Sequence, residues 1–189
     1  MKFNFGNINS IRDIVRQAVR YKKSGNALDL GSGVGRHSLF LAKKGFHVTA
    51  IDNSSENLAA LKELARIQNL PIKTEKIDLN QYKPSKKYDF IVSTMVLHFI
   101  SHPLQKKSIT VMQDFTKPLG VNVVSNYSDK NPKATRPYLI NAEKLKKQYT
   151  ENGWKIVHYQ EYLSEPMTKS DGSKKTVRYW ITDLIDQKV

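Results

Sequence analysis

The stretch ALDLGSGVGRHSLFLAKKGFHVTAIDNS, residues 27–54, decides the fold of this 189-residue chain. An apolar run of strand type leads into a glycine-rich segment, which is followed by an apolar pattern of helical spacing and a second strand ending at Asp52. Glycine permits positive φ angles and close approach of the backbone to a ligand, so Gly31, Gly33 and Gly35 predict a binding turn between a strand and a helix. Several nucleotide-containing cofactors use this outline.

The spacing of the glycines separates these cofactors. A dinucleotide fingerprint reads G-x-G-x-x-G/A, and its third small residue lets the helix pack tightly beneath a pyrophosphate. Here the bulky cation Arg36 takes that third position, and Asp29 stands two residues before Gly31. A carboxylate is poorly placed beside a pyrophosphate, but it suits S-adenosylmethionine, which carries a sulfonium and an ammonium and has no phosphate. The pattern therefore favours S-adenosylmethionine and leaves a nicotinamide dinucleotide as a distant alternative.

Further polar residues fit the same cofactor. Asp52, with Asn53 beside it, lies about 20 residues beyond the first glycine, where an acid accepts hydrogen bonds from both ribose hydroxyls. Asp78 can accept a hydrogen bond from an adenine amino group, and Arg36 at the helix start can bind a methionine carboxylate. Each residue also has a purely structural interpretation; Asp29, for example, can be a buried carboxylate bonded to loop amides. The combination in register favours the cofactor site.

Strands and helices alternate along most of the chain. The predicted strands cover residues 26–32, 47–52, 72–79, 88–94, 121–127, 154–163 and 174–185. Alternation indicates an α/β fold of the Rossmann-like, doubly wound type, with a mostly parallel sheet and helices on both faces. The last two strands follow each other directly, and Asp171-Gly172 between them predicts a hairpin, so the sheet should contain an antiparallel C-terminal strand.

The two-sided arrangement predicts where a ligand binds. In an open sheet of this kind, ligands lie beyond the carboxyl ends of the strands, at the point where strand order reverses. Gly31, Asp52, Asp78 and Thr94 should therefore converge on one crevice. We expect a single domain over 1–189, with a helical N-terminal segment (1–25), a cofactor-binding core (26–130) and an acceptor-side segment with the terminal hairpin (131–189).

Composition narrows the chemistry. The sequence contains no cysteine, which excludes disulfides, cysteine-ligated metal centres and a cysteine nucleophile. The net charge of +14 is spread evenly, with +8 up to Met95 (16 basic minus 8 acidic residues) and +6 beyond it (15 minus 9). An even distribution favours a solvated surface over a nucleic-acid footprint, so nucleic acid is the less favoured partner. No apolar run reaches the ~20 residues of a membrane span, and the expected location is the cytoplasm.

At these motifs the sequence resembles the class I S-adenosylmethionine-dependent methyltransferases, and more narrowly the tellurite-resistance (TehB-type) methyltransferases. The first two family motifs correspond to residues 28–52, and IDLN (77–80), YDFIVSTMVLHFI (88–100), MQDFTKPLG (112–120) and DGSKKTVRYW (171–180) follow in the expected order. The resemblance covers nearly the whole chain. It implies a seven-stranded sheet whose last strand is antiparallel, S-adenosylmethionine as methyl donor, and S-adenosylhomocysteine as product.

The resemblance also implies roles for individual residues. Gly31 and Gly33 would contact the methionine part and Asp52 the ribose. Asp78 and Leu79 would contact the adenine, and the Thr94 backbone would contact the methionine amino group. The family pattern has a His-Arg pair before the hairpin turn, where this sequence has Pro166 and Met167. The fourth motif is also not an N/D-P-P-Y/F tetrapeptide, which argues against amino methylation of adenine, cytosine or glutamine.

The methyl acceptor is less well defined than the donor. A sulfonium methyl is already activated, so the enzyme mainly aligns the reactants, and a base is needed only when the acceptor must lose a proton. Candidate catalytic residues on the acceptor side are His98, Arg136 and Arg178. No residue cluster has metal-ligand spacing, so no metal is expected. We expect transfer to a small molecule such as an oxyanion or a thiol; RNA or protein methylation, and a non-catalytic cofactor-binding module, remain as alternatives.

Overall fold

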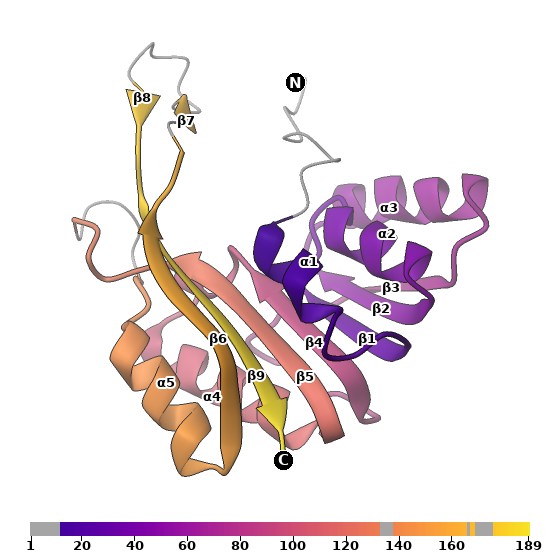
Figure 1. Cartoon of the computed structure of the whole chain (residues 1–189). Helices are drawn as coiled ribbons and strands as arrows, with labels where there is room; N and C mark the ends of the chain where they lie inside the picture. Colours follow the sequence, from indigo (N-terminus) through magenta and orange to yellow (C-terminus); the bar gives the residue numbers. More distant parts are fainter. Residues whose placement is uncertain (1–11, 133–137, 166, 169–175) are drawn as a thin grey trace.

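The computed structural model describes residues 12–132, 138–165, 167–168 and 176–189 (Figure 1). The described strands are β1 (Gly25–Leu30), β2 (Phe46–Asp52), β3 (Ile72–Lys76), β4 (Tyr88–Thr94), β5 (Thr116–Tyr127), β6 (Trp154–Leu163), β7 (Met167–Thr168), β8 (Thr176–Val177) and β9 (Trp180–Lys188). The described helices are α1 (Asp13–Ala18), α2 (Arg36–Lys43), α3 (Ser55–Ile67), the 3₁₀ turn η1 (Leu97–Phe99), α4 (His102–Asp114) and α5 (Ala142–Glu151). None of these helices is long and apolar enough to cross a membrane.

Seven strands form one sheet in the order β3-β2-β1-β4-β5-β9-β6. Strand β1 pairs in parallel with both β2 and β4, whereas β9 pairs antiparallel with β5 and with β6. This arrangement confirms the predicted Rossmann-like sheet with an antiparallel C-terminal strand. The chain builds the sheet outward from β1 to β3 and then restarts at β4 on the other side. Strand order therefore reverses between β1 and β4, and this is the switch point at which such sheets bind ligands.

Helices cover both faces of the sheet, with α1, α2 and α3 on one side and α4 and α5 on the other (Figure 1). On the first face, Ile14 and Val15 of α1 pack with Val121 and Val123 of β5. On the second face, α4 and α5 bury Met112 and Tyr149 against the sheet. Strand β4 lies in the middle and is buried along its whole length, as expected for a parallel strand covered on both sides.

The strand ends differ from the predicted ranges at several places. Strand β1 ends at Leu30, where the prediction ran on to residue 32, and β5 begins at Thr116 instead of residue 121. Strand β3 ends at Lys76, because the Asp78 side chain and carbonyl accept hydrogen bonds from the next residues and form a turn: Asn80 N is 2.9 Å from Asp78 Oδ1 and Gln81 N is 3.0 Å from Asp78 O. The predicted strand over 174–185 is divided, since β8 pairs with β7 in a separate two-stranded ladder and the sheet strand begins at Trp180. The Asp171-Gly172 turn lies outside the described residues.

Candidate functional site

The turn after β1 is built from backbone hydrogen bonds and positive φ angles. Gly31, Gly33 and Gly35 have φ angles of 71°, 54° and 83°. The amides of Gly31 and Ser32 both donate to the carbonyl of Ile51 on β2, each at 2.9 Å, and Gly35 N donates to Ser32 O at 2.9 Å. All three glycines therefore adopt a conformation that other L-residues rarely take, and the turn is anchored to the neighbouring strand.

The surroundings of the three glycines are not the same. A Cβ atom on Gly31 would lie 2.5 Å from a methyl group of Val96, and one on Gly35 would collide with the side chain of Leu61. A Cβ on Gly33 would meet nothing within 4 Å. Gly31 and Gly35 thus allow close packing inside the protein, whereas Gly33 faces open space. Gly33 is where a ligand can approach the backbone.

Asp52 links the end of β2 to this turn. Its Oδ2 accepts a hydrogen bond from Gly33 N at 2.8 Å, and its Oδ1 accepts one from Ser54 N at 2.9 Å. The carboxylate is half-buried, and each oxygen keeps a second lone pair that can accept a bond from a ligand hydroxyl. Asn53 follows on the exposed surface. The predicted position of Asp52 beside the glycine turn is therefore confirmed, while its contact with a ribose stays a prediction.

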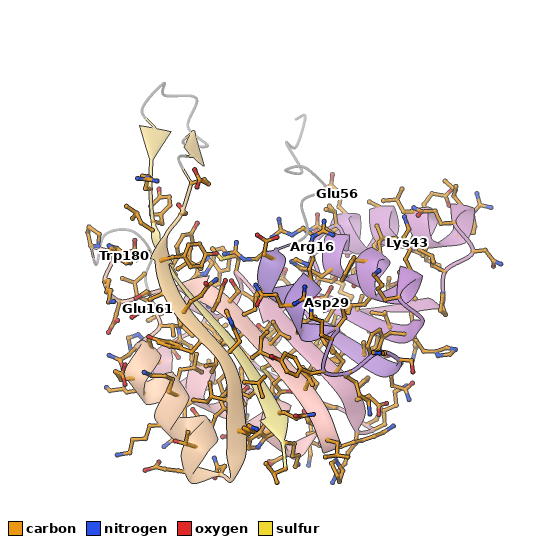
Figure 2. All side chains as sticks on the ribbon, in the orientation of Figure 1. Arg16, Asp29, Lys43, Glu56, Glu161 and Trp180 are labelled. Atoms are coloured by element: carbon orange, nitrogen blue, oxygen red, sulfur yellow. The ribbon has the colours of Figure 1, made fainter. Side chains whose placement is uncertain are left out.

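Asp29 lies within β1, one residue before the end of the strand. Figure 2 labels this residue. The side chain is buried, and Oδ2 accepts a hydrogen bond from Ser38 Oγ on α2 at 2.6 Å. Burial raises the pKa of Asp29 to about 6, and the bond from Ser38 and the charge of Arg36 counteract part of that effect. Asp29 is therefore a buried, hydrogen-bonded carboxylate, as its structural interpretation predicted. Its partner is Ser38 Oγ and not the loop amides that the interpretation named.

Arg36 is the first residue of α2 and is half-buried beside the turn. Burial and the positive charge of Arg12 lower the pKa of its guanidinium, while Asp29 acts in the opposite direction. Arg12 also approaches the sheet from the start of α1, since its Nη2 donates to Tyr162 Oη at 3.2 Å. His37 follows Arg36 in a buried position, and burial lowers its pKa to about 3, so its ring is neutral at pH 7. The charge at the start of α2 therefore comes from Arg36.

The end of β4 meets the glycine turn. Thr94 is the buried last residue of β4, and Met95 N donates to Ser125 O on β5 at 2.7 Å. Met95 has a φ of 58°, a conformation that non-glycine residues adopt uncommonly, and it redirects the chain beyond the sheet. Val96 then packs against Gly31. Gly31 and Thr94 therefore lie at one site, as the sequence predicted.

Asp78 and Leu79, which the resemblance predicts to contact the adenine, follow the end of β3. Ile77 N donates to Asp52 O at 3.0 Å, which brings this segment against the end of β2. Asp78 is exposed, and its Oδ1 already accepts bonds from Asn80 N and Asn80 Nδ2. Leu79 is half-buried and lines a small, mainly apolar pocket together with Leu30, Asn80, Tyr82, Ser93, Leu97 and Leu104. Apolar side chains with a few polar groups are the usual lining of small-molecule pockets.

His98 is the buried middle residue of η1, with 1% of its surface exposed. Its Nδ1 lies 2.6 Å from Asn126 Oδ1 on β5, and its ring contacts those of Phe99 and Tyr127 at centroid distances of 4.1 and 4.8 Å. Tyr127 in turn contacts Tyr179 at 5.2 Å. We call these four aromatic side chains, His98, Phe99, Tyr127 and Tyr179, the aromatic cluster. It lies where β4 and β5 end and β9 approaches.

Of the two arginines expected on the acceptor side, only Arg178 lies within the described residues. Arg178 is exposed, and its Nε donates to Ser164 O at 3.0 Å, which joins the segment before β9 to the segment after β6. Arg136 and Pro166 lie outside the described residues, as does the Met167 side chain. Within the described ranges, no group of three or more acidic or histidine side chains could hold a metal ion.

Sequence reasoning missed Ser38 and Asn126. Each is joined to a predicted site residue by a hydrogen bond between different elements, Ser38 to Asp29 and Asn126 to His98. Ser38 stands nine residues after Asp29, on the helix that the same motif predicts, so helical spacing offered a weak signal. Asn126 is 28 residues from His98, and no pattern within the sequence relates the two.

Comparison with known proteins identifies the family. The family profile of the tellurite resistance protein TehB matches residues 2–182. A probable S-adenosyl-L-methionine-dependent methyltransferase TehB of Haemophilus influenzae (strain 10810) is 30% identical over 184 residues, which are 96% of this chain and 64% of that relative. The crystal structure of TehB from Haemophilus influenzae superposes with a TM-score of 0.86 at 27% identity, covering 95% of this chain and 63% of that chain.

A more distant structure shares the fold. The N-methyltransferase NodS of Bradyrhizobium japonicum WM9, solved with S-adenosyl-L-homocysteine, gives a TM-score of 0.74 at 17% identity over 93% of this chain and 84% of that chain. The chain spans a little less than two thirds of the length of the TehB relatives it matches. By the profile match over almost its entire length, the chain belongs to the TehB tellurite-resistance protein family.

Proposed function

We propose that this chain binds S-adenosylmethionine at the glycine turn and transfers its methyl group to a small-molecule acceptor. The observation that carries the proposal is the open space at Gly33, whose amide is held by Asp52 at the switch point of the sheet. Membership of the TehB family supports the same donor, because the Haemophilus influenzae relative is named as a probable S-adenosyl-L-methionine-dependent methyltransferase.

The residues of the site suit the separate parts of this cofactor. Asp52 has acceptor capacity left for the ribose hydroxyls, and Leu79 offers an apolar wall for the adenine. Arg36 at the start of α2 is available for the methionine carboxylate, since no ion pair of Arg36 with an acid is found among the described residues. The acceptors proposed for the cofactor ammonium are the carboxylate of Asp29 and the backbone carbonyl of Thr94. When bound, S-adenosylmethionine supplies an activated methyl group on its sulfonium. The methyl group is transferred to the acceptor, and the electron pair of the broken carbon–sulfur bond stays on sulfur.

The aromatic cluster supports a small acceptor with an apolar or aromatic body. The Tyr127 ring packs edge to face with His98 and with Tyr179 at the carboxyl ends of β4 and β5, and Val96 joins this region to the glycine turn. Aromatic rings bind apolar surface well, and their preference for edge-to-face or offset stacking orients an aromatic ligand. The protein's contribution to methyl transfer is then alignment of the acceptor and exclusion of water. A neutral thiol, hydroxyl or amine on such a body suits the exposed ring of Phe99 at the edge of this cluster better than a compact oxyanion does.

The proposal is tested by binding and by transfer. Titration calorimetry should show binding of S-adenosylmethionine and S-adenosylhomocysteine and much weaker binding of a nicotinamide dinucleotide. A radiolabelled methyl-transfer screen should include thiols, phenols, amines, selenite, tellurite, RNA and protein. Transfer confined to RNA or protein would overturn the small-molecule part, and tight cofactor binding with no transfer to any acceptor would indicate a non-catalytic module. Preference for the dinucleotide would overturn the proposal entirely.

A further inference from the structure

A row of polar side chains crosses the carboxyl end of the sheet beside the glycine turn. Thr94 of β4 pairs with Ser125 of β5, and Ser125 pairs with Asp183 of β9. Asp183 in turn pairs with Gln160 of β6. Residues paired across neighbouring strands lie on the same face of the sheet, with Cβ atoms about 4.5–5.5 Å apart in antiparallel pairs. We call these four residues the polar row; it begins at Thr94, in the candidate cofactor site, and runs toward β6.

The polar row lies on the face of the sheet that α1 covers. Val123 of β5 and Ile185 of β9 belong to the buried cluster that contains the apolar residues of α1. Side chains two positions apart on a strand share a face, so Ser125 and Asp183 face the same side as Val123 and Ile185. The row is therefore enclosed between the sheet and the segment at the start of α1.

Arg12, the residue before α1, joins the polar row to the cofactor site. Its Nη2 donates to Tyr162 Oη on β6 at 3.2 Å. Burial and the charge of Asp183 raise the pKa of the Tyr162 hydroxyl, and the charge of Arg12 acts against them, so these three side chains lie close together. Burial and the charge of Arg12 also lower the pKa of the Arg36 guanidinium. Arg12 is therefore near both Asp183 and the proposed binding site of the methionine carboxylate.

Three buried polar atoms in this region have no hydrogen-bond partner among the described residues. They are Arg12 Nε, Ser125 Oγ and Asp183 Oδ1. Ser125 and Asp183 have 0% and 2% of their surface exposed, and the other oxygen of Asp183 accepts a bond from Gln160 Nε2 at 3.3 Å. An unpaired buried polar group lowers folding stability, and few persist in native proteins without a reason. Three of them in one region indicate a site at which a ligand completes the bonds.

The three atoms define the chemistry of the ligand. Arg12 Nε–H can only donate a hydrogen bond, Asp183 Oδ1 can only accept one, and the Ser125 hydroxyl can do either. The charges of Arg12 and Asp183 have opposite sign, so the site as a whole does not favour an anion or a cation. The complementary group is therefore neutral, and it both accepts and donates a hydrogen bond. A hydroxyl or a carboxamide meets this requirement.

The distance from Thr94 shows which part of a methyl acceptor can reach this site. Neighbouring strands are about 4.8 Å apart, so Ser125 lies about 5 Å and Asp183 about 10 Å from Thr94 across the sheet. In a reactive complex the acceptor atom lies about 3–3.5 Å from the methyl carbon, so it cannot also occupy the far end of the row. We propose that Arg12, Ser125 and Asp183 form a specificity site that binds a neutral hydroxyl or carboxamide of the methyl acceptor, remote from the methylated atom. This inference rests on the proposed function and adds a polar end to the apolar body proposed there.

Recognition of the polar group can be measured without methyl transfer. Benzamide is the probe, because it carries a neutral carboxamide on one ring, and benzoate and benzylamine are the matched anion and cation. Nuclear magnetic resonance titration of the full chain, with and without S-adenosylhomocysteine, should show that benzamide binds at least about 10-fold more tightly than either charged probe. Equal binding of the three probes, or tighter binding of a charged one, would overturn the proposal.

Asp183→Asn tests the acceptor atom. Gln160 Nε2 donates to one oxygen of Asp183, so the new amide should keep its carbonyl oxygen there and place its amino group where Oδ1 was. The site then presents a donor in place of an acceptor, and benzamide should bind about 10-fold more weakly. Asp186→Asn is the matched control: this buried, unpaired acid lies three positions along the same strand, on the opposite face of the sheet. Benzamide should bind this control as it binds wild type, and equal affinity for all three proteins would overturn the proposal.

Ser125→Ala separates recognition from folding. Since Ser125 Oγ has no partner among the described residues, its removal should leave the free energy of unfolding unchanged or slightly higher. Benzamide affinity should nevertheless fall several-fold, because one hydrogen bond to the ligand is lost. Urea unfolding and the same titration measure the two effects. A protein that loses stability while its affinity for benzamide is unchanged would show that Ser125 has a structural role, and this would overturn the proposal.

In methyl transfer the same site should act through the KM of the acceptor. With the best acceptor of the radiolabelled screen, Asp183→Asn should raise that KM about 10-fold and change kcat and the KM of S-adenosylmethionine little, because the site lies beyond the reacting atom. An unchanged acceptor KM would overturn the proposal, as would a loss confined to kcat. If no acceptor is methylated at all, the proposed function fails, and the benzamide titration still decides whether Arg12, Ser125 and Asp183 form a binding site.

Discussion

Asp52 Oδ2 accepts a hydrogen bond at 2.8 Å from the amide of Gly33, a residue nineteen positions earlier in the chain. The same carboxylate receives Ser54 N through its other oxygen, so it joins the turn after β1 to the start of α3. Gly33 is also the glycine of the turn that faces open space. The carboxylate proposed to bind the ribose therefore also holds the backbone of the glycine turn. Its loss should weaken cofactor binding in two ways, by removing the ribose contact and by releasing the turn.

Asp52→Ala should raise the dissociation constant of S-adenosylmethionine at least about 10-fold, because one charged hydrogen-bond acceptor is worth roughly 1.5–3 kcal/mol. Calorimetric titration measures the change. Ser54→Ala is the matched control: it removes the cap bond from Asn57 N to Ser54 Oγ and costs about 1 kcal/mol of stability, but leaves the Asp52 carboxylate in place. Equal affinity loss in the two variants would mean that Asp52 acts only through stability.

Gly33→Ala should lower cofactor affinity by at least about 10-fold while the fold survives, since the new methyl group projects into the ligand's space and the positive φ costs only about 1–2 kcal/mol. Gly45→Ala is the control, because Gly45 also has a positive φ and open surroundings but lies at the far end of α2. Its thermal stability should fall by a similar amount with unchanged binding. Gly35→Ala should destabilise the protein more than either, because its methyl group meets Leu61.

The glycine turn and Asp52 could be predicted because their signals are local. Glycine spacing, the apolar runs beside it and the acid at the next strand end all lie within residues 27–54, and parallel pairing brings the ends of neighbouring strands together. The mostly parallel sheet with helices on both faces followed from the alternation of strands and helices. These features depend on hydrophobic periodicity and on the geometry of the strand–turn–helix–strand unit, and both can be predicted from a single sequence.

The partners of Asp29 and His98 could not be predicted in the same way. The sequence indicated an acid before Gly31, but the bond from Ser38 depends on which side of β1 faces α2. The bond between His98 and Asn126 depends on the register of β4 and β5 and on the turn at Met95. Such contacts between elements arise from packing, for which the sequence carries no periodic pattern. The end of β3 was also missed, because the Asp78 turn competes locally with the strand.

The ionisation of Asp29 should appear in cofactor binding. Burial raises the pKa of Asp29 to about 6, so the carboxylate loses its charge as the pH falls through that value. If it faces the cofactor ammonium, the affinity for S-adenosylmethionine should decrease below pH 6, and Asn at this position should abolish the decrease. Titration calorimetry of wild type and Asp29→Asn across this range checks the prediction. A parallel fall in both proteins would assign the pH dependence to another group.

The same raised pKa has an opposite consequence for folding. The carboxyl of Asp29 is protonated in the folded state up to about pH 6, but ionises near 3.8 in an unfolded chain. Its contribution to stability is therefore complete below 3.8 and is lost as the pH rises through about 6. Asp29→Asn should consequently gain stability relative to wild type on going from acidic to neutral pH, in the range where wild type gains cofactor affinity. Ionisation of Asp29 should thus lower folding stability while it raises cofactor affinity.

The ionisation of Asp186 should lower the stability of the protein at alkaline pH. It lies on β9 with 0% of its surface exposed, neither carboxylate oxygen has a hydrogen-bond partner among the described residues, and burial raises its pKa to about 8. Because the folded pKa lies above the unfolded value of 3.8, its contribution to stability is complete below 3.8 and is lost as the pH rises through 8. Asp186→Asn should therefore change little near pH 4 and gain a few kcal/mol, about 1.4 per pH unit of the shift, by about pH 9. Urea unfolding across this range measures the difference, with exposed Asp114→Asn as the control that should follow wild type. A difference between Asp186→Asn and wild type that stays constant with pH would show that Asp186 ionises in the folded protein as it does in the unfolded chain.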